Sequence, residues 1–116
     1  MPVSDSFRTF VLDQLGRAVP RIRARSMFGG VGIYSGELFF ALLASDTLYL
    51  KVDDSNRPDF EGRGMGPFLP FGDDRDKMQY YEVPADLLED PEALRPWAEK
   101  SIAVAARKKS KKARKP

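Results

Sequence analysis

The chain has 116 residues, the size of one domain, and 42% of them are hydrophobic, enough to form a core. It contains neither histidine nor cysteine, which excludes disulfides, imidazole or thiolate metal ligands, thiol nucleophiles and imidazole bases. The net charge of +2 conceals a division: residues 1–106 carry 12 basic and 17 acidic side chains, whereas residues 107–116 carry seven basic ones and no acid.

The first predicted element is a helix over residues 5–18. Apolar residues recur there at steps of three and four, Ser4 suits the N-cap, and Pro20 stops the helix. The first residues contain no basic segment followed by an apolar one, and no apolar run approaches the ~18–20 residues of a membrane span. We therefore expect a cytoplasmic protein that has no membrane partner.

Strands are predicted next, because apolar residues either alternate with polar ones or run together between turn signals. The predicted strands cover residues 22–27, 31–34, 38–44 and 48–53. Short turns such as Ser35-Gly36 separate them, and short turns join antiparallel neighbours. The pattern therefore indicates an antiparallel meander.

The remainder of the chain returns to helix. A short helix is predicted over residues 56–62, a strand over residues 77–83, and a long helix that begins at Asp90-Pro91 and ends near Arg107. Pro96 predicts a kink or a restart in that helix. Strands grouped between flanking helices favour an α+β fold, a two-layer sandwich of one antiparallel sheet with helices on one face.

Both faces of the predicted strand 38–44 are apolar. Helices on one face bury only half of this surface, so either the apolar loop 67–71 or a second copy of the chain covers the rest. We expect a homodimer, with Phe39, Leu43 and Tyr49 at its interface.

Two clusters invite a chemical interpretation. The Gly29-Gly30-Val31-Gly32 run could cradle a phosphate, but it lacks the spacing of known phosphate loops, so a β-bulge or a close strand crossing is favoured. Asp53-Asp54 and Asp73-Asp74-Asp76 could hold a divalent cation, but aspartates are common in solvated turns. We therefore predict no catalytic, cofactor-binding or metal-binding residue.

Basic residues gather in two places. Arg21, Arg23 and Arg25 share one face of a predicted edge strand, where they either contact an anion or protect the edge from pairing. Residues 107–116 contain no apolar side chain larger than alanine, so a disordered tail is predicted. Such a tail either binds DNA or RNA phosphates without sequence preference or only keeps the chain soluble. Its candidate nucleic-acid-binding residues are Arg107, Lys108, Lys109, Lys111, Lys112, Arg114 and Lys115.

The strand motifs together resemble the N-terminal domain of the TfoX/Sxy family. The resemblance covers residues 5–106, and its order of motifs is more specific than any one of them. The motifs are Arg25-Ser26-Met27-Phe28-Gly29-Gly30-Val31-Gly32-Ile33-Tyr34, Phe40-Ala41, Leu48-Tyr49-Leu50-Lys51-Val52-Asp53, Pro67-Phe68, Tyr80-Tyr81-Glu82-Val83-Pro84 and Trp97.

This resemblance implies an α+β domain similar to the secretion-chaperone-like fold, with no established catalytic site. The full-length members that it resembles are regulators of natural competence that act with the cyclic AMP receptor protein at certain promoters. Those regulators carry a second, C-terminal helical domain, whereas this sequence has the basic residues 107–116 in its place. We therefore expect a stand-alone TfoX N-terminal-like domain over residues 1–106, followed by the basic tail.

Two functions are compatible with these patterns. The first is a non-enzymatic regulatory or adaptor domain that contacts a regulatory protein partner, with non-specific nucleic-acid binding by the tail. The alternative is a small-ligand-binding protein or an uncharacterised enzyme. Its pocket would lie between loop 64–76 and the sheet, near Gly29, Gly30, Tyr34, Tyr49 and Tyr81.

Overall fold

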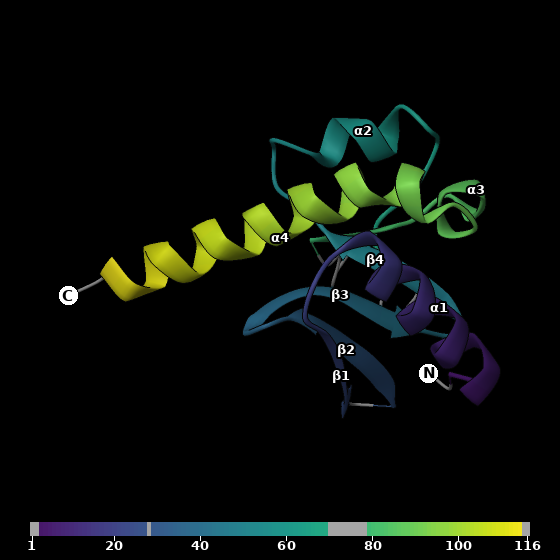
Figure 1. Ribbon diagram of the computed structural model, residues 1–116. Helices are drawn as coiled ribbons and strands as arrows, with labels where there is room; N and C mark the ends of the chain where they lie inside the picture. The colour runs from purple at the N-terminus through teal and green to yellow at the C-terminus, as the bar shows by residue number, and fades with distance from the viewer. Residues whose placement is uncertain (1–2, 28, 70–78, 115–116) are drawn as a thin grey trace.

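A computed structural model describes residues 3–27, 29–69 and 79–114, except for the side chains of residues 111–114. The elements in chain order are α1 (Asp5–Ala18), β1 (Ile22–Met27), β2 (Gly30–Ser35), β3 (Leu38–Ala44), β4 (Thr47–Lys51), α2 (Arg57–Glu61), β5 (Tyr80–Glu82), α3 (Ala85–Leu88) and α4 (Pro91–Arg114). Figure 1 shows α1 and α4 on one side of the curved sheet. Within the described residues, no helix is long and apolar enough to cross a membrane.

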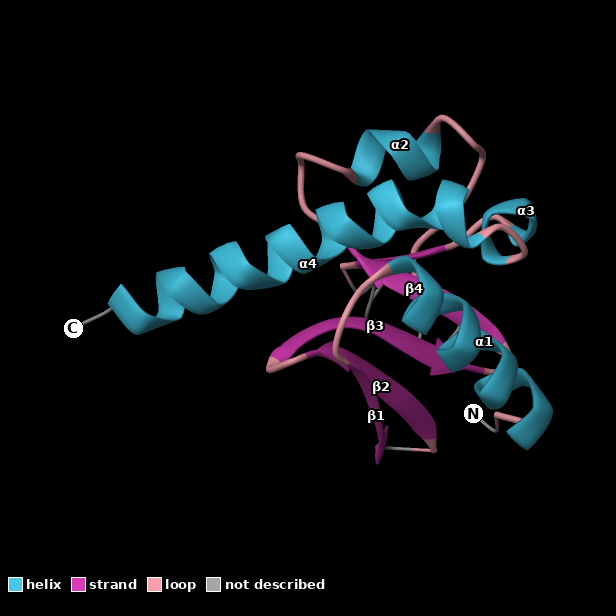
Figure 2. Cartoon of the chain, in the orientation of Figure 1, coloured by secondary structure: helices cyan, strands magenta, loops and turns pink. Residues whose placement is uncertain are grey.

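The five strands form one antiparallel sheet in sequence order, β1-β2-β3-β4-β5. Helices α1 and α4 pack against the sheet and each other, and α2 lies outside the N-terminal half of α4 (Figure 2). The predicted α+β sandwich with one antiparallel sheet is therefore confirmed.

The core lies between the sheet and the two long helices. Side chains from every layer are fully buried there, including Val11 and Leu15 from α1, Ile33 and Leu43 from the sheet, and Leu94 from α4. Apolar burial on this scale is the main stabilising term in a domain of this size. It holds α4 in a fixed position across the sheet.

A β-bulge in β3 corrects the predicted faces of that strand. Tyr34 pairs with Phe39 and Ile33 pairs with Ala41, so Phe40 is an extra residue between them. The extra residue places Phe40, Ala41 and Leu43 together in the helix-covered core. The predicted grouping of Phe39 with Leu43 is therefore wrong, and Leu43, with none of its surface exposed, is a core residue instead of an interface residue.

The glycine run lies in and before β2, not in a phosphate loop. A Cβ on Gly30 would lie 2.5 Å from the Leu43 carbonyl oxygen, and one on Gly32 would lie 2.6 Å from Met27 Cε. Gly30 therefore needs to be glycine, because the backbone of β3 approaches it closely, whereas at Gly32 the neighbouring atom is the flexible end of the Met27 side chain, which can shift. The close-strand interpretation is confirmed.

Helix α4 is longer than predicted. It continues through Pro96, so the restart, one of the two outcomes predicted there, does not occur; the proline removes the bond to the carbonyl of Glu92, an exposed residue of the first turn. It also continues to Arg114, so residues 107–114 are helical and the predicted disorder is wrong there. Lysine, arginine and alanine are good helix formers, and extending an existing helix needs no new nucleation.

The other elements lie close to their predictions. Ser4 caps α1 by accepting a hydrogen bond from the Phe7 N–H at 3.3 Å, and Asp90 accepts from the first turn of α4. Strand β5 covers only part of the predicted strand 77–83, of which residues 77 and 78 lie outside the described residues. Helix α3, which follows Pro84, was not predicted.

Candidate nucleic-acid interface

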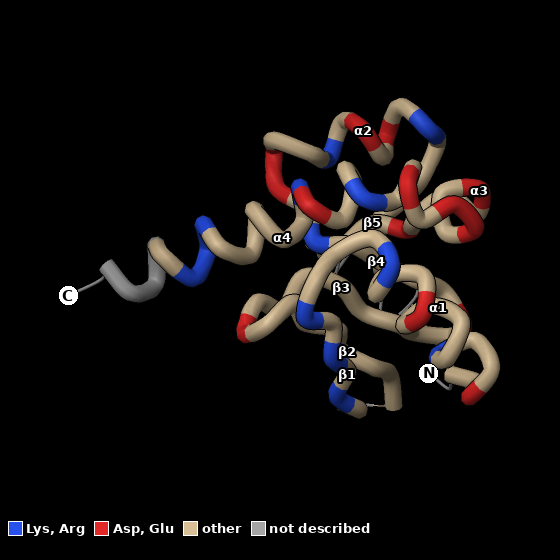
Figure 3. Tube along the Cα trace, viewed as in Figure 1, with Lys and Arg blue, Asp and Glu red and all other residues tan. Residues whose placement is uncertain are grey.

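Apolar packing of α4 ends at Ala105, and its basic segment begins two residues later. Val104 and Ala105 are buried, whereas Arg107, Lys108 and Lys109 are exposed. Figure 1 shows this end of the helix running out beyond the sheet, and Figure 3 shows lysine and arginine along it. The side chains of Lys111, Lys112 and Arg114, and the whole of Lys115, lie outside the described residues.

A buried polar junction fixes the start of this segment against the sheet. The hydroxyl of Ser101 and the amide of Asn56 both donate to the Lys51 carbonyl oxygen, at 2.8 and 3.1 Å. The Asn56 side-chain oxygen also accepts from the Asp53 N–H at 2.9 Å. Because buried polar groups are costly unless paired, these bonds define how β4, the turn after it and α4 meet.

That junction brings Asp53 next to the basic end of α4. The Arg107 guanidinium donates to the Asp53 carboxylate at 3.0 Å and to the Ser55 hydroxyl at 2.9 Å. Burial would raise the pKa of Asp53, but hydrogen bonds from Ser55 and Arg107, together with the Arg107 charge, lower it to about 2. Asp53 therefore stays ionised at neutral pH and pairs with Arg107 of α4.

A second ion pair lies two residues further along α4. Lys109 donates to the Glu37 carboxylate at 3.0 Å, and this bond, together with the lysine charge, lowers the pKa of Glu37. Lys108 lies between the two pairs on the chain and, among the residues that the structure describes, makes no ion pair. Both pairs are exposed, so each contributes little to stability.

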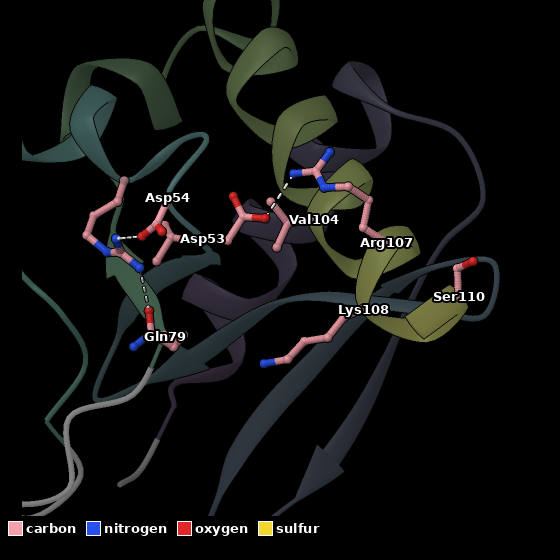
Figure 4. A pocket seen from close by; sticks show the side chains of 9 residues that line it. Asp53, Asp54, Gln79, Val104, Arg107, Lys108 and Ser110 are labelled. Carbon is pink, nitrogen blue, oxygen red and sulfur yellow. Dashed lines mark hydrogen bonds and ion pairs between the residues drawn. The ribbon is translucent and has the colours of Figure 1, made fainter. Parts of the chain in front are cut away.

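Lys108 borders two hollows. One, of about 600 Å³, lies between the turn after β4 and α4, and its lining includes Asp53, Asp54, Arg57 and Arg107 (Figure 4). The other, of about 340 Å³, lies where β3 begins and β4 ends, and includes Phe39 and Lys109 in its lining. The first hollow is lined by acidic and basic side chains, and two of them, Arg57 and Asp54, form an ion pair at 2.5 Å.

The residues named for the predicted ligand pocket do not converge. Tyr81 lies on the core side and donates from its hydroxyl to Glu61 at 3.4 Å, whereas Tyr49 lies on the opposite face, 4.9 Å from Phe68 between ring centroids. Residues 70–76 of the predicted loop lie outside the described residues. The part that is described, through Phe68, packs directly onto the sheet.

The helix-free face of the sheet is aromatic and partly covered by the chain itself. Phe68 and Tyr80 are buried on it, while Phe39, Leu42 and Tyr49 are half-buried. Burial, with a smaller contribution from Tyr34, raises the pKa of Tyr80 to about 12, so its hydroxyl stays neutral. The apolar surface left for a second copy is therefore smaller than expected, and the homodimer stays a prediction.

Three arginines lie at the sheet edge beside this face, Arg21 directly before β1 and Arg23 and Arg25 within it. Arg23 donates to the Gly36 carbonyl at 2.9 Å, and its guanidinium carbon lies 5.5 Å from the Tyr34 ring centroid. Arg21, Arg23 and Arg25 are exposed and make no ion pair with any residue that the structure describes. An edge strand carrying unpaired positive charge fits both the protective and the anion-binding interpretation.

The acidic residues take structural positions. Asp53 and Asp54 pair with arginines, and Glu82 is exposed on β5. In the described part of the chain, no three acidic side chains lie close enough to hold a metal ion. Asp73, Asp74 and Asp76 lie outside that part.

Comparison with known proteins supports the fold and names a family. A comparison with curated proteins finds no significant match to the chain. The protein-family model of the TfoX N-terminal domain matches residues 13–105, which ends just before the basic segment of α4. Since this match spans most of the 116 residues, the chain belongs to the TfoX N-terminal domain family.

Proposed function

We propose that this TfoX N-terminal domain is a non-enzymatic regulatory or adaptor module, and that the basic end of α4 gives it non-specific affinity for DNA or RNA phosphates. Membership of the family supports the regulatory or adaptor role. The observation that carries the nucleic-acid part is the continuation of α4 beyond the core as a helix that is rich in lysine and arginine.

The helical form matters for this function. A disordered basic segment loses conformational freedom when it binds, whereas a helix already holds its charges in place. The ion pairs of Arg107 with Asp53 and of Lys109 with Glu37 orient the first basic turn in the free chain. Phosphate oxygens can replace both carboxylates, because each pair is exposed to solvent and therefore weak.

Charge separation favours the same function. The rest of the chain has a formal charge of −5, so it repels nucleic acid, and the seven basic residues at 107–115 concentrate the attraction in one segment. For a duplex, the main contact is therefore expected at the end of α4.

The absence of histidine and cysteine from the whole sequence supports a non-enzymatic role, because it removes the commonest general base and the thiol nucleophile. In the hollow of about 600 Å³, Asp53 is paired with Arg107 and Asp54 with Arg57, so neither carboxylate is set up as a general base.

The test is a fluorescence-anisotropy titration of a labelled DNA duplex of mixed sequence. Lys108, Lys111 and Lys112 are replaced together by glutamine, which keeps the helix propensity and removes three charges. We expect the affinity to fall about tenfold or more at low salt. The matched control replaces Arg8, Arg17 and Arg63 by glutamine, and it should bind as tightly as the wild-type chain.

An equal loss in both variants would show that only net charge matters and would contradict a site on α4. Deletion of residues 107–116 provides the limiting case, and unchanged duplex binding after that deletion would overturn the proposal. Circular dichroism of each variant checks that the fold is retained.

A further inference from the structure

A row of side chains crosses the helix-free face with one member from each of the five strands. Arg23 of β1 lies over Tyr34 of β2, whose ring centroid is 5.1 Å from that of Phe39 of β3. Phe39 lies 5.8 Å from Tyr80 of β5, and the ammonium group of Lys51 of β4 lies 4.8 Å from the Tyr80 ring centroid. At about 4.8 Å between neighbouring strands, the row is about 19 Å long.

The row lies at the end of the sheet that also holds the basic end of α4. The hollow of about 340 Å³ beside Phe39 is bordered by Lys51, Lys108 and Lys109. On the other side, a hollow of about 210 Å³ beside Tyr34 is bordered by Arg23 and Arg25. The two half-buried rings thus lie between two groups of cations.

We propose that this surface, formed by Arg23, Arg25, Tyr34, Phe39, Lys108 and Lys109, binds single-stranded nucleic acid. We call it the aromatic-basic band. The proposal rests on the proposed function, because Lys108 and Lys109 also belong to the basic end of α4, and it adds a substrate class: unpaired strands in preference to duplex.

The chemistry of the band fits a single strand better than a duplex. Single-strand-binding proteins combine a cationic path for the phosphates with aromatic rings or arginine planes on which bases stack. The bases of a duplex are already stacked on one another, so they offer no free faces to Tyr34 and Phe39. A duplex can therefore contact only the cationic side chains of the band, through its phosphates.

The stack has an open end at Arg23. The rings of Tyr34 and Phe39 stack at an interplanar angle of 26°, and the exposed guanidinium of Arg23 continues the stack beyond Tyr34. A base stacks on the guanidinium plane or takes its place against the Tyr34 ring. Arg25, which has no ion pair among the described residues, then lies beside the strand to meet a phosphate.

The carboxylate of Glu37 opposes binding. Glu37 lies in the turn between Tyr34 and Phe39, and it is neutralised by Lys109 at 3.0 Å. A phosphate that reaches Lys109 breaks this pair and frees a carboxylate at the band. We therefore expect moderate affinity and a steep decrease with salt.

The test compares two labelled probes with the full chain, oligothymidylate of about 12 nucleotides and a mixed-sequence duplex. Tyr34→Leu and Phe39→Leu keep an apolar side chain but remove the ring. Each should weaken oligothymidylate binding about tenfold and leave duplex binding unchanged. Tyr49→Leu is the matched control, a half-buried ring on the same face outside the band, and it should change neither. The same titration with oligouridylate shows whether RNA and DNA strands bind alike.

Photo-crosslinking of the wild-type chain to oligothymidylate gives a second measurement that needs no variant. Fragmentation of tryptic peptide 26–51 should place the crosslink on Tyr34 or Phe39. Crosslinks on α4 alone would overturn the proposal that the band binds single strands, and so would folded ring variants that bind oligothymidylate as tightly as wild type. Either result would leave the proposed duplex binding by α4 in place. If the wild-type protein has the mass of a dimer in solution and the Phe39→Leu variant that of a monomer, the band serves self-association instead. That result would also overturn the proposal.

Discussion

The two halves of α4 share one helix but are held by different forces. In the first half, Leu94 and Ala98 are fully buried against the core, and Ser101 hydrogen-bonds to the backbone of β4. In the second half, from Arg107 onward, the described polar contacts with the body are two ion pairs and the hydrogen bond from Arg107 to Ser55, all between exposed groups. Helical structure and stabilising contacts are therefore separated along one element: the first half stabilises the fold, and the second is free to serve binding.

The largest expected loss of stability comes from a substitution in the first half of α4. Leu94→Ala removes a fully buried side chain and leaves a cavity, so the free energy of unfolding should fall by about 2–5 kcal/mol. Lys108→Ala, in the second half, should change it by no more than about 0.5 kcal/mol. Urea unfolding of both variants checks this, and equal losses would remove the distinction between the halves.

The polar junction between the halves should show the next largest effect. Asn56→Ala removes bonds to the Lys51 carbonyl and the Asp53 N–H, so we expect a loss of about 1–3 kcal/mol in unfolding free energy. Ser110→Ala, an exposed position further along α4, serves as the control. If Asn56→Ala were as stable as wild type, the junction would not position Asp53.

A smaller effect is expected from the ion pair that begins the second half. Asp53→Asn should cost less than about 1 kcal/mol, because the Asp53 and Arg107 side chains are 41% and 55% exposed. The folded pKa of Asp53 is lowered from 3.8 to about 2. Its contribution is thus present above pH 3.8 and is lost as the pH falls through about 2. Unfolding free energies of both proteins should therefore differ at neutral pH and converge near pH 2, and a difference that grows in acid would contradict this pairing.

The smallest effect on stability is expected at Glu37. Glu37→Gln breaks an exposed pair with Lys109 and should change the unfolding free energy by less than about 0.5 kcal/mol. It also removes a negative charge from the band, so the affinity for oligothymidylate should rise by a factor of about two to five. A weaker affinity would show that Lys109 needs Glu37 to hold its position.

Local patterns predicted most of the fold correctly. The ends of α1, the antiparallel strands and the start of α4 follow from signals such as Ser4, Ser35-Gly36 and Asp90-Pro91, which act over a few residues. The bulge at Phe40 could not be predicted in the same way, because it depends on which residue of β2 faces which residue of β3. That one inserted residue moved Leu43 into the core and separated it from Phe39.

The candidate site was predicted only in part. The seven basic residues were found from composition, but their low apolar content predicted disorder, whereas helix propensity and the helix that precedes them continue the structure to Arg114. The row from Arg23 to Tyr80 brings together residues up to 57 positions apart in the chain, so alternation within one strand could not reveal it. Residues 107–116 alone contain no aromatic ring; the sheet supplies the rings beside them.

The salt dependence of duplex binding tests most directly the claim that the second half of α4 serves binding. Each phosphate contact contributes about 0.9 to the slope of log affinity against log salt concentration. Replacing Lys108, Lys111 and Lys112 by glutamine should therefore reduce the slope by about 2.7, while replacing Arg8, Arg17 and Arg63 should leave it unchanged. The same slope for the wild-type chain and the α4 variant would contradict the claim.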